Sequence, residues 1–269
     1  MEIKVSPFDT HFMDQLDKLP PPEWQSNAYD LFMYNDWQPW FHPYQVLDKH
    51  KLVGFGMIFH FADVAWLGWI IVDKRYRKLG IGTAIAQHLM LECKNMGVSK
   101  MVLTATELGV PVYEKLGFKT IDWYYFFSVP VAYQAKIDKT KIRPASKADF
   151  EAIVQLDNRA TGEKREALLK NHLDAIYVYQ RKNVEGFYVQ NLGTGLIIAA
   201  TPEAGEQLSS YRIKKNNNKI YVPGGNAAFI EELRSNGFTE TAKIPRMVLG
   251  APHHWNPEMI YNRAAGYCG

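Results

Sequence analysis

The stretch VAWLGWIIVDKRYRKLGIGT, residues 64–83, contains the features that decide the fold. Its first part, Val64 to Val72, is an apolar run of strand length, rich in aromatic and β-branched side chains. A basic segment, Asp73 to Lys78, follows the run, and Gly80 and Gly82 lie just before a pattern of helical spacing. The stretch therefore predicts a strand, a basic glycine loop and a helix in direct succession.

The loop is suited to bind a phosphate group. The start of a helix presents unpaired N–H groups and the positive end of its dipole. Gly80 and Gly82 permit a close backbone approach or a positive φ, and basic side chains lie nearby. An isolated G-x-G is more often a tight turn with solvated basic residues. The spacing fits neither a P-loop nor G-x-G-x-x-G, which leaves the pattern Arg-x-x-Gly-x-Gly from Arg77 to Gly82.

Apolar spacing, helix stops and β-branched runs predict the elements around this loop. The expected strands cover residues 2–5, 45–48, 52–61, 64–72, 100–104 and 118–127. Helices are expected before residue 36, over 83–96 and from 111 to 117. This order predicts an α+β fold of three layers, in which helices flank a mixed, mostly antiparallel central sheet.

The order of these elements is repeated in the second half of the chain. Ile142-Arg143-Pro144 leads to a helical stretch, as the start of the chain does, and Gly195 to Ala199 resembles Gly68 to Val72. A helix end before Gly237-Phe238 likewise resembles the one before Gly117-Phe118. The matches in the same order predict two copies of one α+β unit, residues 1–135 and 136–269, with the polar stretch 135–140 as the boundary.

The combination of the Arg77-to-Gly82 loop after a strand with Tyr113 ahead of Gly117-Phe118 resembles the GCN5-related N-acetyltransferase (GNAT) superfamily. The segment Leu103 to Tyr113 is also similar to a bacterial subgroup whose second, degenerate acetyltransferase-like domain follows the first in tandem. The resemblance implies an acyltransferase that moves an acetyl group from acetyl-CoA directly to a primary amine in a ternary complex.

The resemblance assigns roles to residues of the first half only. The loop and helix start would hold the pyrophosphate of acetyl-CoA, and the backbones of Ile70 and Val72 would pair with its pantetheine arm. Tyr113 matches the general acid, and a phenol of pKa about 10 can supply a proton to a leaving thiolate. The expected pyrophosphate-binding residues are Arg77, Lys78, Leu79, Gly80, Ile81, Gly82 and Thr83.

Two parts of the family's site are not matched. Thr106 stands where many relatives carry a cofactor-binding Asn. An alkyl amine is about 0.1% neutral at pH 7, so the reaction needs a proton acceptor. The candidates are Asp36, His60, Asp63 and Glu107, and the sequence does not choose among them.

The second half lacks the basic glycine loop. Its strand at residues 196–200 runs into Thr201-Pro202-Glu203-Ala204-Gly205-Glu206, so Glu203 and Glu206 would place negative charge where a pyrophosphate should bind. We therefore expect this half to be a scaffold that does not bind CoA and a wall of the acceptor pocket. The alternatives are a non-catalytic acyl-CoA sensor and a binding module with two degenerate halves.

The segment from Tyr29 to Tyr44 is rich in aromatic residues and, by the resemblance, borders the acceptor pocket. An aromatic wall with a few carboxylates suits a small-molecule amine with an apolar or aromatic body. A peptide or protein amine is the alternative acceptor, and the aromatics could instead join the two domains. The residues concerned are Tyr29, Phe32, Tyr34, Trp37, Trp40, Phe41 and Tyr44, with Asp30, Asp36 and His42 among them.

Composition limits which binding partners, metals and cellular locations are expected. Of the 269 residues, 47% are hydrophobic and 22% charged, and 31 Lys and Arg against 28 Asp and Glu give a net charge of +3, which does not argue for a nucleic acid or an anionic membrane. Cys93 and Cys268, the 2 cysteines, lie far apart, and adjacent His253 and His254 have no accompanying ligand cluster, so no disulfide and no metal are expected. With no apolar run of membrane-spanning length, a cytoplasmic protein is expected.

Overall fold

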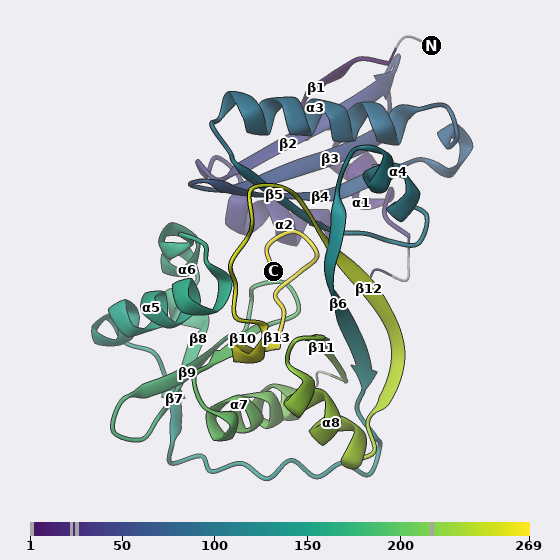
Figure 1. Ribbon diagram of the computed structural model, residues 1–269. Helices are drawn as coiled ribbons and strands as arrows, with labels where there is room; N and C mark the ends of the chain where they lie inside the picture. Colours follow the sequence, from purple (N-terminus) through teal and green to yellow (C-terminus); the bar gives the residue numbers. More distant parts are fainter. Residues whose placement is uncertain (1–2, 22–23, 25–26, 216–217) are drawn as a thin grey trace. The chain divides into compact units, whose positions relative to one another are not determined.

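The computed structural model describes residues 3–21, 24, 27–215 and 218–269 (Figure 1). The chain divides into two compact units that do not follow the halves of the sequence. The first unit contains residues 1–104, 108–119 and 248–251, and the second contains residues 105–107, 120–247 and 252–269. Each unit thus includes a segment from the other half of the sequence.

The first unit is a mixed sheet flanked by helices. Its strands follow the order β1-β2-β3-β4-β5; β1 to β4 are antiparallel to their neighbours, and β4 pairs with β5 in parallel. The elements are β1 (Val5–Pro7), α1 (Met13–Asp17), α2 (Ala28–Asn35), β2 (Phe41–Asp48), β3 (Lys51–Phe61), β4 (Val64–Val72), α3 (Ile81–Asn95), β5 (Lys100–Thr104) and α4 (Val110–Lys115).

The second unit repeats this succession of strands and helices. One sheet has the order β13-β10-β9-β8-β7, and β6 lies between β12 and β11. The elements are β6 (Lys119–Ser128), β7 (Ile142–Pro144), α5 (Phe150–Thr161), α6 (Glu166–Asn171), β8 (Ile176–Gln180), β9 (Val184–Val189), β10 (Leu196–Ala199), α7 (Pro202–Lys214), β11 (Lys219–Pro223), α8 (Ala227–Ser235), β12 (Thr239–Gly250) and β13 (Ile260–Asn262). Lys119 is the last residue of its segment in the first unit, and β12 is divided after Met247, with its remaining residues 248–250 in the first unit.

The predicted α+β class and mostly antiparallel sheet are confirmed, and the element bounds need small corrections. β1 covers Val5–Pro7, so the strand expected at residues 2–5 lies later, and Glu2 is outside the described residues. β2 covers Phe41–Asp48, so it begins earlier than the strand expected at residues 45–48. α3 begins at Ile81 because Gly80, which takes a positive φ, is its N-cap.

Two glycines of β3 allow α3 to lie directly on the sheet (Figure 1). A Cβ at Gly54 would come within 2.9 Å of the side chains of Ile81 and Ile85, and a Cβ at Gly56 within 2.5 Å of Ile85 Cγ2. Ile81, Ile85 and Leu89 of α3 are buried. The close approach fixes the start of α3 beside the end of β4.

The opposite face of the sheet carries an aromatic layer. Phe55 has no exposed surface, and its ring centroid lies 5.3 Å from Phe8, 6.5 Å from Phe32 and 6.2 Å from Trp69. Alternation along β3 thus separates a glycine face under α3 from an aromatic face on the other side.

Gly56→Ala should destabilise the protein by about 1–2 kcal/mol, because the new methyl group would collide with a stiff, β-branched and buried Ile85. The midpoint of urea unfolding measures the effect. Gly82→Ala is the matched control, since its Cβ would lie 3.6 Å from Val72 Cγ2, an ordinary contact. Equal midpoints for the two variants would contradict the packing argument.

Candidate active site

β4 pairs with β5 over only the first part of its length. β4 and β5 are paired from Val64 and Lys100 to Trp66 and Val102, and the register ends there although β4 continues to Val72. A strand edge without a ladder partner presents N–H and C=O groups to an extended ligand. Ile70 and Val72, expected to pair with a pantetheine arm, both lie on this stretch and are half-buried.

A bulge changes the direction of β4 within the same stretch. The register with β3 shifts between Phe55 and Met57, where Gly56 faces the extra residue of β4. Trp69 takes a φ of 49°, in the left-handed region that a tryptophan rarely adopts. A Cβ on Gly56 would lie 3.4 Å from Ile70 Cγ1, so Ile70 faces α3, whereas Trp69 contacts Phe55 on the other face. The strained, bulged backbone marks this part of the strand as a candidate site.

The basic loop is held in place by an ion-pair network. The Asp73 carboxylate accepts hydrogen bonds from Lys51 Nζ at 2.6 Å and from the Arg75 backbone N–H at 2.9 Å. Tyr76 Oη donates to Asp48 at 2.8 Å and lies under Lys51. Burial by itself raises the pKa of Asp73, but the hydrogen bonds from Lys51 and then Arg75 outweigh it and lower the pKa. The loop is therefore anchored to the β2–β3 hairpin through an ionised carboxylate.

The start of α3 has the features of an anion site. Gly80, its N-cap, has a φ of 82° and forms no side-chain cap. The first bond that closes the helix runs from Ala84 N to Gly80 O at 2.9 Å, so the N–H groups of Ile81, Gly82 and Thr83 precede the ladder. These N–H groups point toward the helix start, where the dipole is positive.

The exposed side chains before the helix add positive charge. Arg77, Lys78 and Leu79 are exposed, and Arg77 Nε donates to Val72 O at 3.3 Å, which ties the loop to the end of β4. Lys78 has a φ of 65° and Gly80 a φ of 82°, so the backbone turns tightly on both sides of Leu79. The structure thus brings the predicted residues 77–83 together at the end of the strand that carries Ile70 and Val72.

Tyr113 lies on the short helix α4 of the same unit. Its side chain is only 9% exposed, and its ring packs edge-to-face on Phe118 at 5.9 Å. Burial raises the pKa of Tyr113, so the phenol stays protonated at neutral pH. A buried, protonated phenol can act as a proton donor and is poorly suited to act as a base.

The candidate bases have different surroundings. Asp63 forms an ion pair with Lys100 at 2.8 Å, and His60 Nε2 lies 2.6 Å from Ala62 O, so both already have structural partners. Asp36 is half-buried and accepts a hydrogen bond from Trp37 N. Thr106 and Glu107 are exposed and belong to the second unit.

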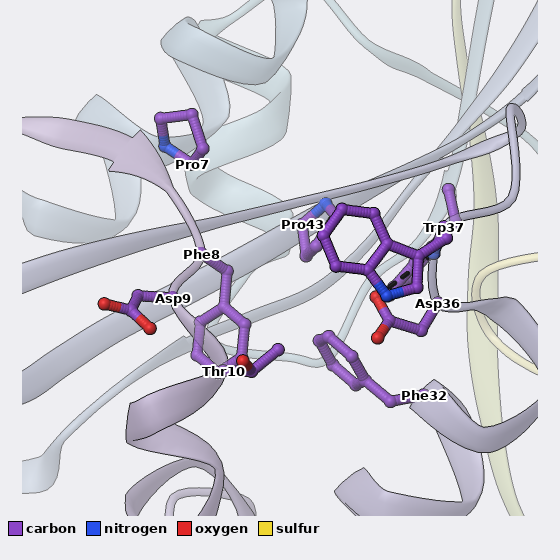
Figure 2. Close-up of a pocket in the computed structure, with 9 residues that line it drawn as sticks. Pro7, Phe8, Asp9, Thr10, Phe32, Asp36, Trp37 and Pro43 are labelled. Atoms are coloured by element: carbon purple, nitrogen blue, oxygen red, sulfur yellow. Dashed lines mark hydrogen bonds between the residues drawn. The ribbon is translucent and has the colours of Figure 1, made fainter.

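The aromatic segment divides between core and surface. Trp40 and Tyr44 are buried, the former donating to Asn35 Oδ1 at 3.3 Å. Phe32, Trp37 and Phe41 line a pocket of the first unit together with Asp36. Tyr29 is exposed and hydrogen-bonded to Asp14. Part of the aromatic segment thus lines a pocket (Figure 2), and its role beside the acceptor stays a prediction.

The corresponding helix start in the second unit is built differently. At α7, the Thr201 side chain accepts from Ala204 N and Pro202 has no N–H to offer. The Glu203 carboxylate accepts hydrogen bonds from Tyr179 Oη, Lys141 Nζ at 2.9 Å and Arg181 Nη1 at 3.0 Å. The chain's own side chains thus occupy the helix start at α7, whereas the start of α3 is open. Lys141 and Arg181 neutralise the Glu203 carboxylate.

Some features of the site carry no clear sequence signal. The Lys51–Asp73 pair joins residues far apart in sequence, so no local pattern could show it. The bulge at Trp69 had one signal, the interruption of the apolar run by Gly68. Among the described residues, no cluster of His, Cys, Asp and Glu could hold a metal, and no helix is long and apolar enough to cross a membrane.

Two family models match the chain at separate places. The acetyltransferase (GNAT) family model matches residues 10–118, and an acetyltransferase (GNAT) domain model matches residues 153–262. The chain therefore belongs to the GNAT acetyltransferases, with two GNAT domains in tandem. It is an acyltransferase of this family, whose members are generally N-acetyltransferases that use acetyl-CoA.

Several relatives of known or provisional name are similar to the chain. The uncharacterized N-acetyltransferase YitH of Bacillus subtilis is 26% identical over 202 residues, 70% of this chain and 71% of YitH. The ribosomal protein bS18-alanine N-acetyltransferase of Escherichia coli is 31% identical over 78 residues, 28% of this chain and 53% of that enzyme. The match to this second enzyme therefore covers about half of its length.

Solved structures share the fold over nearly the whole chain. A provisionally named acetyltransferase from Pyrococcus horikoshii has a TM-score of 0.83 at 19% identity and covers 99% of this chain and 96% of its own. A tandem GNAT protein from the clavulanic acid biosynthesis pathway has a TM-score of 0.64 at 12% identity, covering 94% and 100%. At these identities the likeness shows the tandem fold alone.

Asp73→Asn should lower the free energy of unfolding by about 1 kcal/mol at pH 7, because it removes the charge that Lys51 and Arg75 surround. The pKa of Asp73 is lowered by folding, so its contribution is present above about pH 4 and is lost as the pH falls further. Urea unfolding at pH 7, 5 and 3 should show the difference from the native protein shrinking with acidity.

Asp174→Asn, at an exposed position, is the control for the removal of one carboxylate and should leave the midpoint nearly unchanged at each pH. A difference between native protein and Asp73→Asn that stays constant down to pH 3 would contradict the assigned ion pair.

Proposed function

We propose that this chain transfers an acetyl group from acetyl-CoA directly to a primary amine of a small molecule, within a ternary complex. One observation carries the proposal: the uncapped start of α3, with its glycines and basic loop, lies at the end of the β4 edge that β5 leaves unpaired. An anion-binding helix start next to a free strand edge suits a ligand with a pyrophosphate and an extended amide-bearing arm.

The residues present fit this ligand. The backbone N–H groups of residues 77–83 would hold the pyrophosphate, with Arg77 and Lys78 adding charge, while Gly82 leaves space for the phosphate oxygens because a Cβ there would meet only Val72. The backbones of Ile70 and Val72 would pair with the amide groups of the pantetheine arm. The Arg75 side chain already forms an ion pair with Asp73, so it would hold the loop in place rather than bind the ligand.

Acetyl-CoA supplies a thioester whose acyl carbon accepts an amine nitrogen. The C–N bond forms as the C–S bond breaks, and the amine loses a proton while the sulfur gains one. Tyr113 Oη carries the proton that it would donate to the sulfur, although burial raises the pKa of this phenol and makes it a weaker acid. Asp36 remains the candidate proton acceptor that is half-buried and free of an ion pair in the described hydrogen bonds.

The domain of residues 136–269 would serve as a scaffold without a bound CoA. The start of α7 is capped by Thr201, and Glu203 places a carboxylate where a pyrophosphate would need positive charge. The boundary near residue 135 is part of this proposal and lies in the segment between β6 and β7.

The acceptor class rests on the aromatic and acidic character of the segment at residues 29–44. The acceptor of one relative, by its name, is an alanine of a ribosomal protein, so a peptide amine is the second candidate acceptor. A non-catalytic acyl-CoA sensor is the second candidate function, and it predicts acetyl-CoA binding without turnover on any amine.

Tyr113→Phe should lower kcat by about 10²–10⁴-fold and leave the affinity for acetyl-CoA nearly unchanged, because it removes one proton donor and keeps the ring. The release of the CoA thiol, followed on a panel of small amines and short peptides, measures kcat. Tyr211→Phe, on a half-buried tyrosine of the second unit, is the control. An unchanged kcat would contradict the role of Tyr113.

A further inference from the structure

Segment 257–263 of the chain is hydrogen-bonded to two strands of the second unit. β13, the strand within this segment, lies beside β10 and pairs with it antiparallel, with Asn262 opposite Ile197 (Figure 1). The backbone N–H of Arg263 donates to Tyr221 O of β11 at 3.0 Å. The segment thus fills a slot between β10 and β11.

The corresponding place in the first unit is open. Gly195 to Ala199 repeats the pattern of Gly68 to Val72, so Ile197 corresponds to Ile70. In the described part of the chain, the β4–β5 register ends at Trp66, before Ile70 is reached. The strand edge that we propose for the pantetheine arm therefore has a counterpart in the second unit that the chain itself covers.

The Asn262 side chain acts in this slot as a backbone amide would. Its Oδ1 accepts a hydrogen bond from Tyr221 N of β11 at 2.8 Å, and its Nδ2 donates to Gly195 O, just before β10, at 2.6 Å. Asn262 has no exposed surface. One carboxamide thus offers an acceptor to one strand and a donor to the other, as an amide group of an extended ligand does.

Glycines leave the space that the segment occupies. A Cβ at Gly205 would collide with the Tyr261 ring, and a Cβ at Gly225 would collide with Pro257. Gly205 lies inside α7, where glycine is unfavourable, and the close fit of Tyr261 explains its presence there. Tyr261 is buried, and its ring centroid lies 4.7 Å from that of Phe229 on α8. The walls of the slot are therefore shaped around this segment.

Arg263 anchors the end of the segment. Its guanidinium lies 5.0 Å from the centre of the Tyr124 ring, 5.1 Å from that of Phe126 and 5.5 Å from that of Tyr221. The residue is buried, and cation–π contacts are stronger where water is excluded. A buried carboxamide and a buried cation at successive positions thus hold the segment in the slot.

The sheets on the two sides of the slot have ladders that do not include the segment. β7, β8, β9 and β10 are joined to one another by antiparallel ladders, and β11 is paired with β6 along its whole length. β13 pairs with β10 at Ile197 and Ile198, and the register shifts between these two residues. The segment therefore resembles a peptide that is bound to a sheet edge by strand addition.

We propose that the slot between β10 and β11 is a peptide-binding site whose resident ligand is the chain's own segment 257–263. The ligand class is an extended peptide in which a carboxamide side chain precedes a guanidinium, as in Asn262-Arg263. The comparison of this slot with a pantetheine groove rests on the proposed function, whereas the peptide site itself does not. An occupied slot, together with the Glu203 carboxylate, keeps CoA out of the second unit.

Cleavage of the full chain beside the segment tests the site. A recognition sequence for a specific protease, inserted between the exposed Ala251 and Pro252, allows the chain to be cut while the segment stays in the slot. An excess of fluorescent peptide of residues 252–269 should then replace the segment to a ratio of one per chain. The exchange should be at least about tenfold faster than global unfolding of the cleaved protein in the same buffer.

Unlabelled peptides that compete with the fluorescent one test the contacts. Asn262→Leu in the peptide should weaken competition by at least about tenfold, because it leaves buried groups of both strands without their partner. Glu258→Leu introduces the same side chain at an exposed position of the segment and should compete as the native peptide does. Equal competition by the two variants, or exchange no faster than global unfolding, would overturn the proposal.

Hydrogen exchange of the intact chain gives a second test that needs no insertion. The N–H groups of Tyr221 and Arg263 should exchange at least about tenfold faster than those of the β8–β9 ladder, because the segment detaches while the sheet stays folded. Equal rates in the two sets would show an integral strand and overturn the proposal. Neither experiment uses acetyl-CoA, so a failure here is distinct from a failure of the proposed acetyl transfer.

Discussion

The site depends on how closely α3 approaches the sheet. Gly54 and Gly56 have no side chains where Ile81 and Ile85 pack on β3, so the start of α3 can lie beside the end of β4. That position lets the N–H groups of residues 81–83 face the loop, and the Lys51–Asp73 pair then holds the loop at the same place. A larger residue under α3 would move the proposed anion site away from the strand edge that we propose for the pantetheine arm.

Much of the site could be predicted because it lies on one continuous stretch. The strand, loop and helix over residues 64–83 have local signals of period, charge and glycine, and the structure forms them in that order. The Lys51–Asp73 pair, the aromatic layer at Phe8 and the pairing of β13 with β10 could not be predicted in this way, because they depend on contacts between segments distant in sequence. The exchange of segments between the two compact units is of the same kind, since residues 248–251 reach the first unit only through folding.

The two domains use the starts of the corresponding helices α3 and α7 in different ways. At α3 an N-cap glycine leaves the first N–H groups to a ligand, whereas at α7 Thr201 and Glu203 satisfy the same region from within the chain. The second arrangement stabilises the helix, since a capping side chain contributes about 1 kcal/mol. The first gives up this contribution, which is the expected cost of an open anion site.

A calorimetric titration of the full chain with acetyl-CoA tests this difference most directly, because its stoichiometry counts the open helix starts. We expect one site per chain, lost in Gly82→Glu and kept in Gly82→Ala; glutamate near the start of α3 is compatible with the helix but opposes a phosphate by charge and volume. Two sites per chain, or binding that survives Gly82→Glu, would contradict the account.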